Sequence, residues 1–258
     1  MPDYKTTKGK VFISCLIILT VALQYGLKYL YKFVIFGEEQ YSQFSWQFKT
    51  LLIVSSGLVL CFAVVASLNK FSFRQSLEML GFGKGFQKPF LVAFISALPS
   101  FIGFFILNGY QATSLSQVFW GSLLPGINEE LVYRAFIIGI LVRYCNWNFW
   151  LTLFLSSFLF AYGHIYQATG LMEKISVFLF ASGAGIGFAL FYKYWNWNIW
   201  FPIFMHVFMN LSFVLFVREG NILMNGTENI FRFLTLAIAI SITIYLSVKE
   251  KKAENKIP

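Results

Sequence analysis

Charged residues are scarce in this chain, and their scarcity excludes an ordinary soluble domain. Asp, Glu, Lys and Arg make up 12% of the 258 residues, about half of the roughly 25% that soluble domains carry. Hydrophobic residues make up 58%, and there are 32 phenylalanines. The apolar residues form long unbroken runs rather than the short alternating segments of a β-barrel. The composition therefore predicts a polytopic α-helical membrane protein.

Cysteine and histidine are also rare, so the chain has few groups for disulfide or metal chemistry. The three cysteines, Cys15, Cys61 and Cys145, are widely spaced and lie in apolar runs. This pattern supplies neither a disulfide framework nor a metal-ligand spacing, and we interpret the cysteines as small core residues. The two histidines, His164 and His206, are not part of an HExxH motif, which is the stronger zinc signal.

The apolar runs predict an all-α transmembrane helical bundle with about eight spanning helices, because each span needs about 20 apolar residues. The first run is too long for the core of a signal peptide. We expect residues 1–258 to form a single membrane domain that ends in a charged, disordered cytoplasmic tail at 249–258. The expected spans are 11–36, 48–68, 89–110, 127–145, 148–166, 174–193, 198–217 and 230–248.

The formal net charge of +9 is explained by membrane topology and predicts no nucleic-acid partner. Basic residues cluster at the ends of the apolar runs and in the terminal segments, where Lys and Arg set helix orientation. If every run spans, the positive-inside rule places both termini in the cytoplasm. The 69–88 loop falls on the same side and contains a short amphipathic stretch suited to the membrane surface. Gly183 and Gly187 in the sixth span, with Ala184 and Gly185 extending the pair, are interpreted as a close helix-packing motif.

Five ionisable side chains lie inside stretches that are otherwise apolar. They are Glu129, Glu130, Arg134, His164 and His206. An ionisable group in hydrocarbon costs about 2.5–3.5 kcal/mol by insertion scales, so it marks a functional site by default. Two acids, one base and two imidazoles in one small membrane protein predict a reaction centre.

Helical geometry predicts that the two glutamate side chains point in different directions. Glu130 and Arg134 are four residues apart, so they share a helix face and are expected to form an ion pair. Glu129 lies about 100° round the helix and can point elsewhere, as a catalytic base must. The alternative is that both acids pair with Arg134 and only stabilise packing.

A second pair of polar groups has the same spacing. His206 and Asn210 are four residues apart on the seventh span, so an imidazole and a carboxamide share one face, where they could hold a metal-bound water or a developing oxyanion. A helix–helix hydrogen bond is the alternative for a lone membrane histidine. Because Glu129 is expected to begin the fourth helix and His164 to end the fifth, all four groups fall in the non-cytoplasmic leaflet. We expect them to share one water-accessible pocket between the fourth, fifth and seventh helices.

Three motifs then resemble a known family. N-E-E-L-V-Y-R at 128–134, F-A-Y-G-H at 160–164 and H-V-F-M-N at 206–210 are similar to the E-E-x-x-x-R, F-x-x-x-H and H-x-x-x-N signature of the CPBP (Abi) intramembrane proteases. That family is related to the type II CAAX prenyl endopeptidase and includes bacteriocin-processing and bacteriocin-immunity proteins. Tyr133 stands where the family often has Phe and Ala135 where Gly is common, but no motif position is lost.

The resemblance implies a membrane-embedded endopeptidase in a prokaryotic cell membrane, with a catalytic core at roughly 120–217 and a membrane-anchored peptide or protein as substrate. Carried onto this chain, Glu129 would be the general base and His164 would orient or polarise the water. His206 and Asn210 would stabilise the tetrahedral oxyanion. The paired glutamate and arginine of the first motif would shape the site.

Zinc and two other functions stay open as alternatives. Two histidines and Glu129 could supply three zinc ligands, whereas a metal-free glutamate mechanism uses the same residues and needs no cofactor. A non-catalytic immunity or partner-binding protein of the same fold would also keep the motifs. A proton-coupled transporter could use buried Glu and His as a relay, but such proteins usually show internal repeats, which this sequence lacks.

Overall fold

Helices account for nearly all of the chain that the computed structural model describes, namely residues 6–68, 72–217, 223 and 226–254. No strand occurs within these ranges, so the fold is an all-α polytopic bundle. The elements are α1 (Thr7–Tyr29), η1 (Leu30–Ile35), α2 (Glu38–Gln43), α3 (Trp46–Leu68), α4 (Phe73–Met79), α5 (Gln87–Asn108), α6 (Leu115–Val118), η2 (Phe119–Leu123), α7 (Leu124–Glu129), η3 (Glu130–Ile140), α8 (Leu141–Cys145), α9 (Phe149–Tyr162), η4 (Ile165–Gln167), α10 (Leu171–Tyr194), α11 (Trp200–Phe216) and α12 (Gly226–Glu254).

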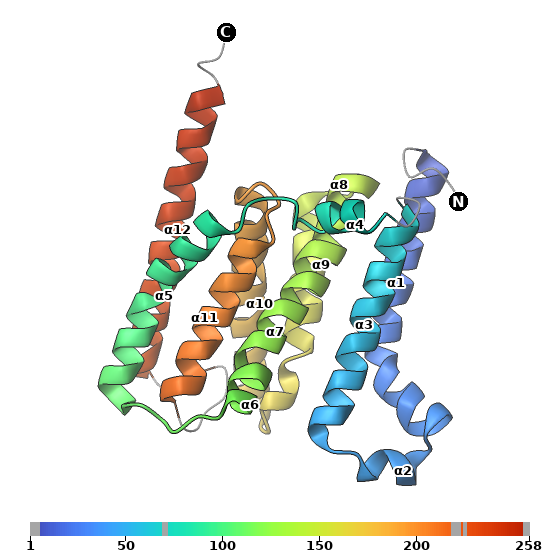
Figure 1. The fold of residues 1–258 in the computed structure, drawn as a ribbon, viewed down its shortest axis with the longest axis horizontal. Coiled ribbons are helices and arrows are strands. Elements are labelled where there is room, and N and C mark those ends of the chain that lie inside the picture. Colours follow the sequence, from blue (N-terminus) through green and yellow to red (C-terminus); the bar gives the residue numbers. More distant parts are fainter. Residues whose placement is uncertain (1–5, 69–71, 218–222, 224–225, 255–258) are drawn as a thin grey trace.

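The helices form three groups across the bundle (Figure 1). One side contains α5, α11 and α12, the middle contains α7, α9 and α10, and α1 pairs with α3 on the other side. Aromatic rings join α5 to α11, as in the edge-on contact of Phe90 with Phe204 at 5.2 Å. The cysteines are free, and Cys61 and Cys145 are buried. Cys15 is exposed, so its interpretation as a core residue is wrong.

Each of the eight predicted spans has a helical counterpart, although they are not equally long. Within the described ranges, six helices are long and apolar enough to cross a membrane. The α11 helix has 17 residues, which at 1.5 Å per residue is about 25 Å, and it packs against α5, α7 and η2 inside the bundle. The stretch from α6 to α8 is interrupted by π-helical turns. Eight complete crossings therefore stay a prediction.

The fourth predicted span begins earlier than expected. Helix α6 starts after Ser114, whose hydroxyl accepts from the Gln117 backbone while the Gln117 side chain accepts from the Ser114 backbone. This capping box is a recognised helix start in sequence. Pro125 does not end the helix, because its missing N–H falls in the first turn of α7, directly after the π turn η2. Glu129 therefore lies within a longer helical stretch, and its prediction as the start of the helix is wrong.

The predicted disordered tail is helical over most of its length. Helix α12 continues to Glu254, so the prediction is wrong for 249–254, while 255–258 lie outside the described residues. Lys, Glu and Ala are good helix formers, and Lys near a helix C-terminus complements the helix dipole. The short helix predicted in the 69–88 loop is confirmed as α4, where Arg74 and Glu78 pair at 3.0 Å, while its place on the membrane surface stays a prediction.

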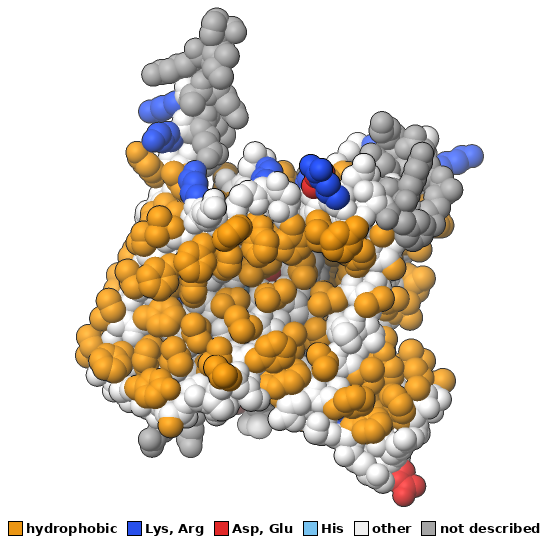
Figure 2. All heavy atoms as spheres, in the orientation of Figure 1, with side chains coloured by type: hydrophobic (Ala, Val, Ile, Leu, Met, Phe, Trp, Pro, Cys, Tyr) orange, Lys and Arg blue, Asp and Glu red, His pale blue; other side chains and the backbone are white. Residues whose placement is uncertain are grey.

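Lys and Arg side chains gather at one end of the bundle, and hydrophobic side chains cover the face between the two ends (Figure 2). The basic end is where α1 begins and α12 ends, whereas α2, with Glu38 and Glu39, lies at the opposite end (Figure 1). This arrangement gives an apolar band between two polar ends, as expected for an integral membrane protein.

The predicted close-packing motif of α10 is confirmed at Gly185 and wrong for Gly183 and Gly187. A Cβ added at Gly183 or Gly187 meets nothing within 4 Å, so neither glycine makes the predicted close packing contact. Gly185 makes it instead, because a Cβ there would lie 2.9 Å from the Ser157 Cβ and 3.0 Å from the Ser157 Cα on α9. The α9–α10 contact therefore depends on Gly185, and the other two glycines face open space.

This difference predicts opposite effects of two Gly→Ala changes on stability. Gly185→Ala should destabilise the fold by about 1–3 kcal/mol through overpacking against Ser157. Gly183→Ala, the matched control, should be neutral or stabilising by up to about 1 kcal/mol, because alanine favours helix and nothing is displaced. Thermal unfolding of both purified variants in detergent measures the difference. Equal melting temperatures would contradict the assigned packing role.

Candidate active site

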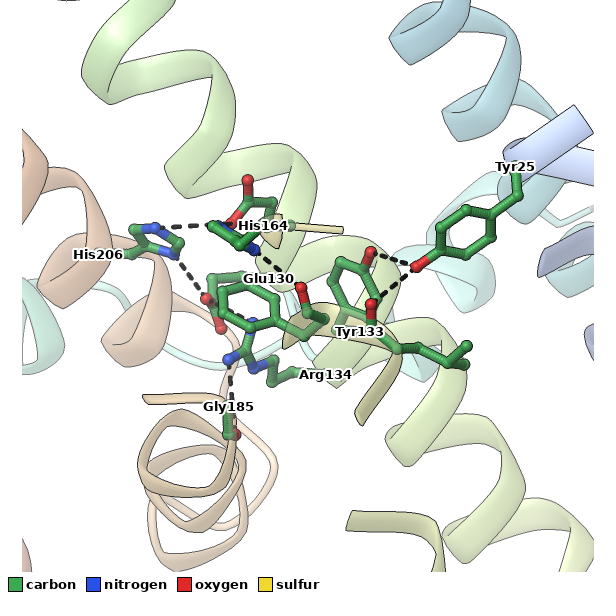
Figure 3. Close-up of polar contacts among 10 residues, drawn as sticks. Tyr25, Glu130, Tyr133, Arg134, His164, Gly185 and His206 are labelled. Carbon is green, nitrogen blue, oxygen red and sulfur yellow. Dashed lines mark hydrogen bonds and ion pairs between the residues drawn. The ribbon is translucent and has the colours of Figure 1, made fainter. Parts of the chain in front are cut away.

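Glu130 is the buried centre of an ionic network. Its side chain is fully buried, and its Oε1 atom lies 3.0 Å from Arg134 Nη1 and 2.8 Å from His206 Nδ1 (Figure 3). The ion pair with Arg134 is the one expected from their spacing. The contact with His206 was not predicted, because it joins η3 to α11 across the bundle. Glu130 thus both neutralises a buried arginine and orients an imidazole.

Arg134 is enclosed by aromatic rings and a backbone carbonyl. Its guanidinium carbon lies 4.6 Å from the ring centre of Phe160 and 5.4 Å from that of Phe188, and Nη2 donates to Gly185 O at 3.5 Å. The same rings pack on the histidines, with Phe160 4.4 Å from His164 and Phe188 5.3 Å from His206 between centres. Cation–π contacts of this kind strengthen when water is excluded.

Glu129 points away from Arg134 and faces both histidines. Its Oε2 atom lies 3.7 Å from His206 Nε2 and 3.9 Å from His164 Nε2. This oxygen is buried and has no hydrogen-bond partner among the described groups, although 21% of the side chain is exposed. Separations above about 3.5 Å exceed a direct hydrogen bond and match a contact bridged by one water.

The contacts of the Nδ1 atoms fix how the two histidine rings are oriented. His164 lies just beyond α9, in the turn before η4, rather than at the helix end. Its Nδ1 atom lies 2.8 Å from Phe160 O, and since a carbonyl only accepts, Nδ1 carries a proton. His206 Nδ1 likewise donates to the Glu130 carboxylate. Both rings therefore present Nε2 to Glu129.

One cavity of about 640 Å³ contains all of the predicted active groups except the buried ion pair. Glu129, His164, His206 and Asn210 line it together, so these four residues meet in one place. Its walls come from α7, α9 and α11, as expected, and also from α10 and α12. Aromatic and aliphatic side chains make up most of the remaining cavity lining. Gly183 and Gly187 also line the cavity, and their lack of a side chain widens it along α10.

Sequence reasoning missed two further features. Arg232 on α12 lines the same cavity, and the signal was available, because this arginine lies between two phenylalanines near the start of the last predicted span. Tyr25 and Tyr133 meet at 3.2 Å between hydroxyl oxygens, and Tyr25 donates to Leu159 O at 2.8 Å (Figure 3). This contact ties α1 to the helices that carry the site, and no local sequence signal predicts it.

The donor set does not have the spacing of a tetrahedral zinc site. With bonds of about 2.0–2.2 Å, neighbouring ligand atoms around zinc lie about 3.3–3.5 Å apart. The two separations from Glu129 Oε2 to the histidines, 3.7 and 3.9 Å, are a few tenths of an ångström wider. In the part of the chain that the structure describes, no group of three or more His, Cys, Asp or Glu side chains is arranged to hold a metal ion.

Comparison with known families supports the motif resemblance. Residues 111–212 match the model of the type II CAAX prenyl endopeptidase Rce1-like family. This segment is Rce1-like. It contains all seven specified residues of the three motifs and confirms the resemblance to the CPBP family. The match supports, at the level of the family, a CAAX-type intramembrane protease that acts on a peptide or protein. No curated protein and no solved structure matches the chain.

The network in the Rce1-like segment predicts that Glu130 is needed for stability. Glu130→Gln should destabilise the fold by about 3–5 kcal/mol, because it leaves Arg134 buried without its counter-ion. Glu129→Gln is the matched control and should melt near the wild type, since Glu129 Oε2 has no direct partner. Thermal unfolding in detergent tests the pair, and equal losses in both variants would contradict this division of roles.

Proposed function

We propose that this chain is a membrane-embedded endopeptidase in which Glu129 activates a water molecule to cleave a peptide bond in a membrane-associated substrate. The main support is the buried Oε2 atom of Glu129, which faces two imidazole nitrogens at water-bridging separations in one cavity. The neighbouring Glu130 is bound through Oε1 to Arg134 and His206 and is not among the residues that line the cavity, so it is unsuited to the same role. The Rce1-like match supports the same class of reaction.

In the proposed reaction Glu129 acts first as base and then as acid. It accepts a proton from water while the water oxygen forms a bond to the scissile carbonyl carbon, and His164 Nε2 orients that water. The carbonyl oxygen becomes an oxyanion. Glu129 then returns the proton to the amide nitrogen, the C–N bond breaks, and the products are a carboxylic acid and an amine.

His206 and Asn210 are proposed to stabilise the oxyanion. Both lie on α11 and line the cavity with Glu129, and hydrogen-bond donors aimed at developing charge lower the barrier. For His206 Nε2 to donate, the ring must carry both protons, because Nδ1 already donates to Glu130. Glu130 compensates that positive charge, so the buried network also serves catalysis.

The orientation of the bundle is part of the proposal. The basic end shown in Figure 2 would face the cytoplasm by the positive-inside rule. Glu129 and His164 lie towards the opposite end, since α9 runs from the basic end to His164 (Figure 1). The site would then open in the outer half of a prokaryotic cell membrane, away from cytosolic prenylated proteins.

The decisive variant for this function is Glu129→Gln. It should abolish cleavage, because glutamine cannot accept the proton of water, while folding stays near normal. The measurement is mass spectrometry of new peptide ends after incubating reconstituted protein with a library of membrane-protein peptides. Glu38→Gln, an exposed change on α2, is the control and should keep full activity. Undiminished cleavage by Glu129→Gln would refute the assignment.

The metal-free form of the mechanism makes a separate prediction. Chelators should change turnover little, and His206→Ala should lower turnover by about 10²–10³-fold through loss of an oxyanion donor. Elemental analysis of the chelator-treated protein, assayed in parallel, provides the measurement. If zinc copurifies in equimolar amount and activity requires it, the metal-free mechanism is wrong.

A further inference from the structure

Tyr25 is a polar side chain of α1 that the proposed reaction does not use. It lies outside the Rce1-like segment and is not among the residues that line the cavity. Its hydroxyl nevertheless contacts two elements of the site. It lies 3.2 Å from the Tyr133 hydroxyl on η3 and donates to Leu159 O on α9 at 2.8 Å (Figure 3). One hydroxyl group of α1 therefore joins η3 to α9 from outside the cavity.

The hydrogen bonds of this contact can run in only one direction. A phenolic hydroxyl has one proton, and Tyr25 donates that proton to Leu159 O, because a carbonyl only accepts. The Tyr133 hydroxyl must then donate to the Tyr25 oxygen. Removing the Tyr25 hydroxyl therefore breaks both bonds. Removing the Tyr133 hydroxyl breaks one bond and leaves the link from α1 to α9 intact.

The packing of α1 against α3 fixes the direction of Tyr25. On the preceding residue, Gln24 Nε2 donates to Gly57 O at 3.0 Å and lies 2.9 Å from Cys61 Sγ on α3. These contacts turn Gln24 to α3, and Tyr25 lies about 100° further round α1. Its ring centre is 6.3 Å from that of Tyr162 on α9. The rotation of α1 therefore holds the Tyr25 hydroxyl at the end of α9.

Leu159 O belongs to the last turn of α9, directly before His164. It also accepts from the Gly163 backbone at 3.1 Å, and the His164 backbone N–H donates to Ala161 O at 3.0 Å. The His164 ring donates to Phe160 O at 2.8 Å. The last carbonyls of a helix lack intrahelical partners and are completed by other donors. The donor from α1 thus helps to hold the turn that carries the His164 ring.

Different contacts set the separations of the two histidines from Glu129. The His206 ring is bonded to Glu130 at 2.8 Å, and Glu130 is the next residue to Glu129, so this separation is fixed through η3 itself. The 3.9 Å separation between Glu129 Oε2 and His164 Nε2 depends instead on how the end of α9 lies against η3. The Tyr25 hydroxyl bonds to both of these elements.

We propose that Tyr25 is a positioning residue that sets the separation between Glu129 and His164. The inference rests on the proposed endopeptidase function and adds to it a residue from outside the Rce1-like segment. Tyr25 acts through Leu159 O and the Tyr133 hydroxyl, which hold the end of α9 against η3, and it takes no part in the bond-making steps. His164 then orients the attacking water at the Glu129 carboxylate. Misplacement by about 1 Å can cost about 10²-fold in rate.

The scarcity of histidine allows a test that does not depend on catalysis. Full-length protein with isotope-labelled histidine gives NMR signals from two imidazoles only, and His206→Ala assigns them. In Tyr25→Phe the His164 signals should shift, while the His206 signals stay in place because the bond to η3 is unchanged. Tyr133→Phe should shift the His164 signals less. Tyr29→Phe changes an exposed tyrosine one turn later on α1; it is the matched control and should shift neither histidine.

Three results would overturn the proposal. They are unmoved His164 signals in Tyr25→Phe, equal shifts of both histidines, and a larger effect of Tyr133→Phe than of Tyr25→Phe, which would contradict the direction of the hydrogen bonds. Thermal unfolding in detergent checks the fold, which should persist because Ser156 Oγ still donates to Tyr133 O at 3.0 Å. If Tyr25→Phe does not fold, unmoved His164 signals in Tyr133→Phe overturn the proposal instead.

Kinetics separate this proposal from the endopeptidase function itself. Tyr25→Phe should lower kcat about tenfold and leave KM unchanged, because the cavity lining is untouched. Unchanged kcat, with intact Glu129-dependent cleavage, removes only the role of Tyr25. A raised KM with unchanged kcat also overturns the positioning role. If the wild type shows no Glu129-dependent cleavage, the endopeptidase function fails, and the histidine signals alone decide whether Tyr25 places His164.

Discussion

The buried carboxylate of Glu130 is the interaction on which the rest of the site depends. It lies against the guanidinium of Arg134 and the imidazole of His206, and Arg134 in turn donates to a carbonyl on α10. Three helices are therefore held in one arrangement by charge-assisted bonds. Such bonds are strong where water is excluded, and each partner would be costly to bury alone. The geometry of the cavity wall follows from this constraint.

Two adjacent glutamates lie in different surroundings, and our proposal therefore gives them different roles. Glu130 is fully buried and bonded on one oxygen to two cations or donors. Glu129, one residue earlier, reaches a cavity and has a buried oxygen without a direct partner in the described chain. Glu130 joins helices through its two contacts, and in the proposed mechanism Glu129 transfers the proton. A similar division applies along α10, where Gly185 packs against α9 and the neighbouring glycines leave the cavity open.

The cavity extends beyond the Rce1-like segment. Residues 111–212 supply the histidines, the glutamates and the asparagine, whereas α12 supplies the far wall with Arg232. Helix α12 is positioned by α5, through Phe231 on Gly103 and Thr235 on Ser100. In the proposed mechanism all of the reacting groups lie in the matched segment, and helices outside it complete the cavity.

The sequence alone determined the all-α class, the approximate helix positions and the Glu130–Arg134 pair, because hydropathy and helical periodicity are local properties. The motif spacing in the sequence also predicted that the four cavity residues lie in one pocket, while their catalytic roles stay predictions. Only the tertiary structure decided that His206 bonds to Glu130, that Gly185 and not Gly183 or Gly187 makes the close helix contact, and that Arg232 lines the cavity. These outcomes depend on the rotation of each helix about its axis. That rotation is fixed by packing between segments far apart in the chain, which no local pattern encodes.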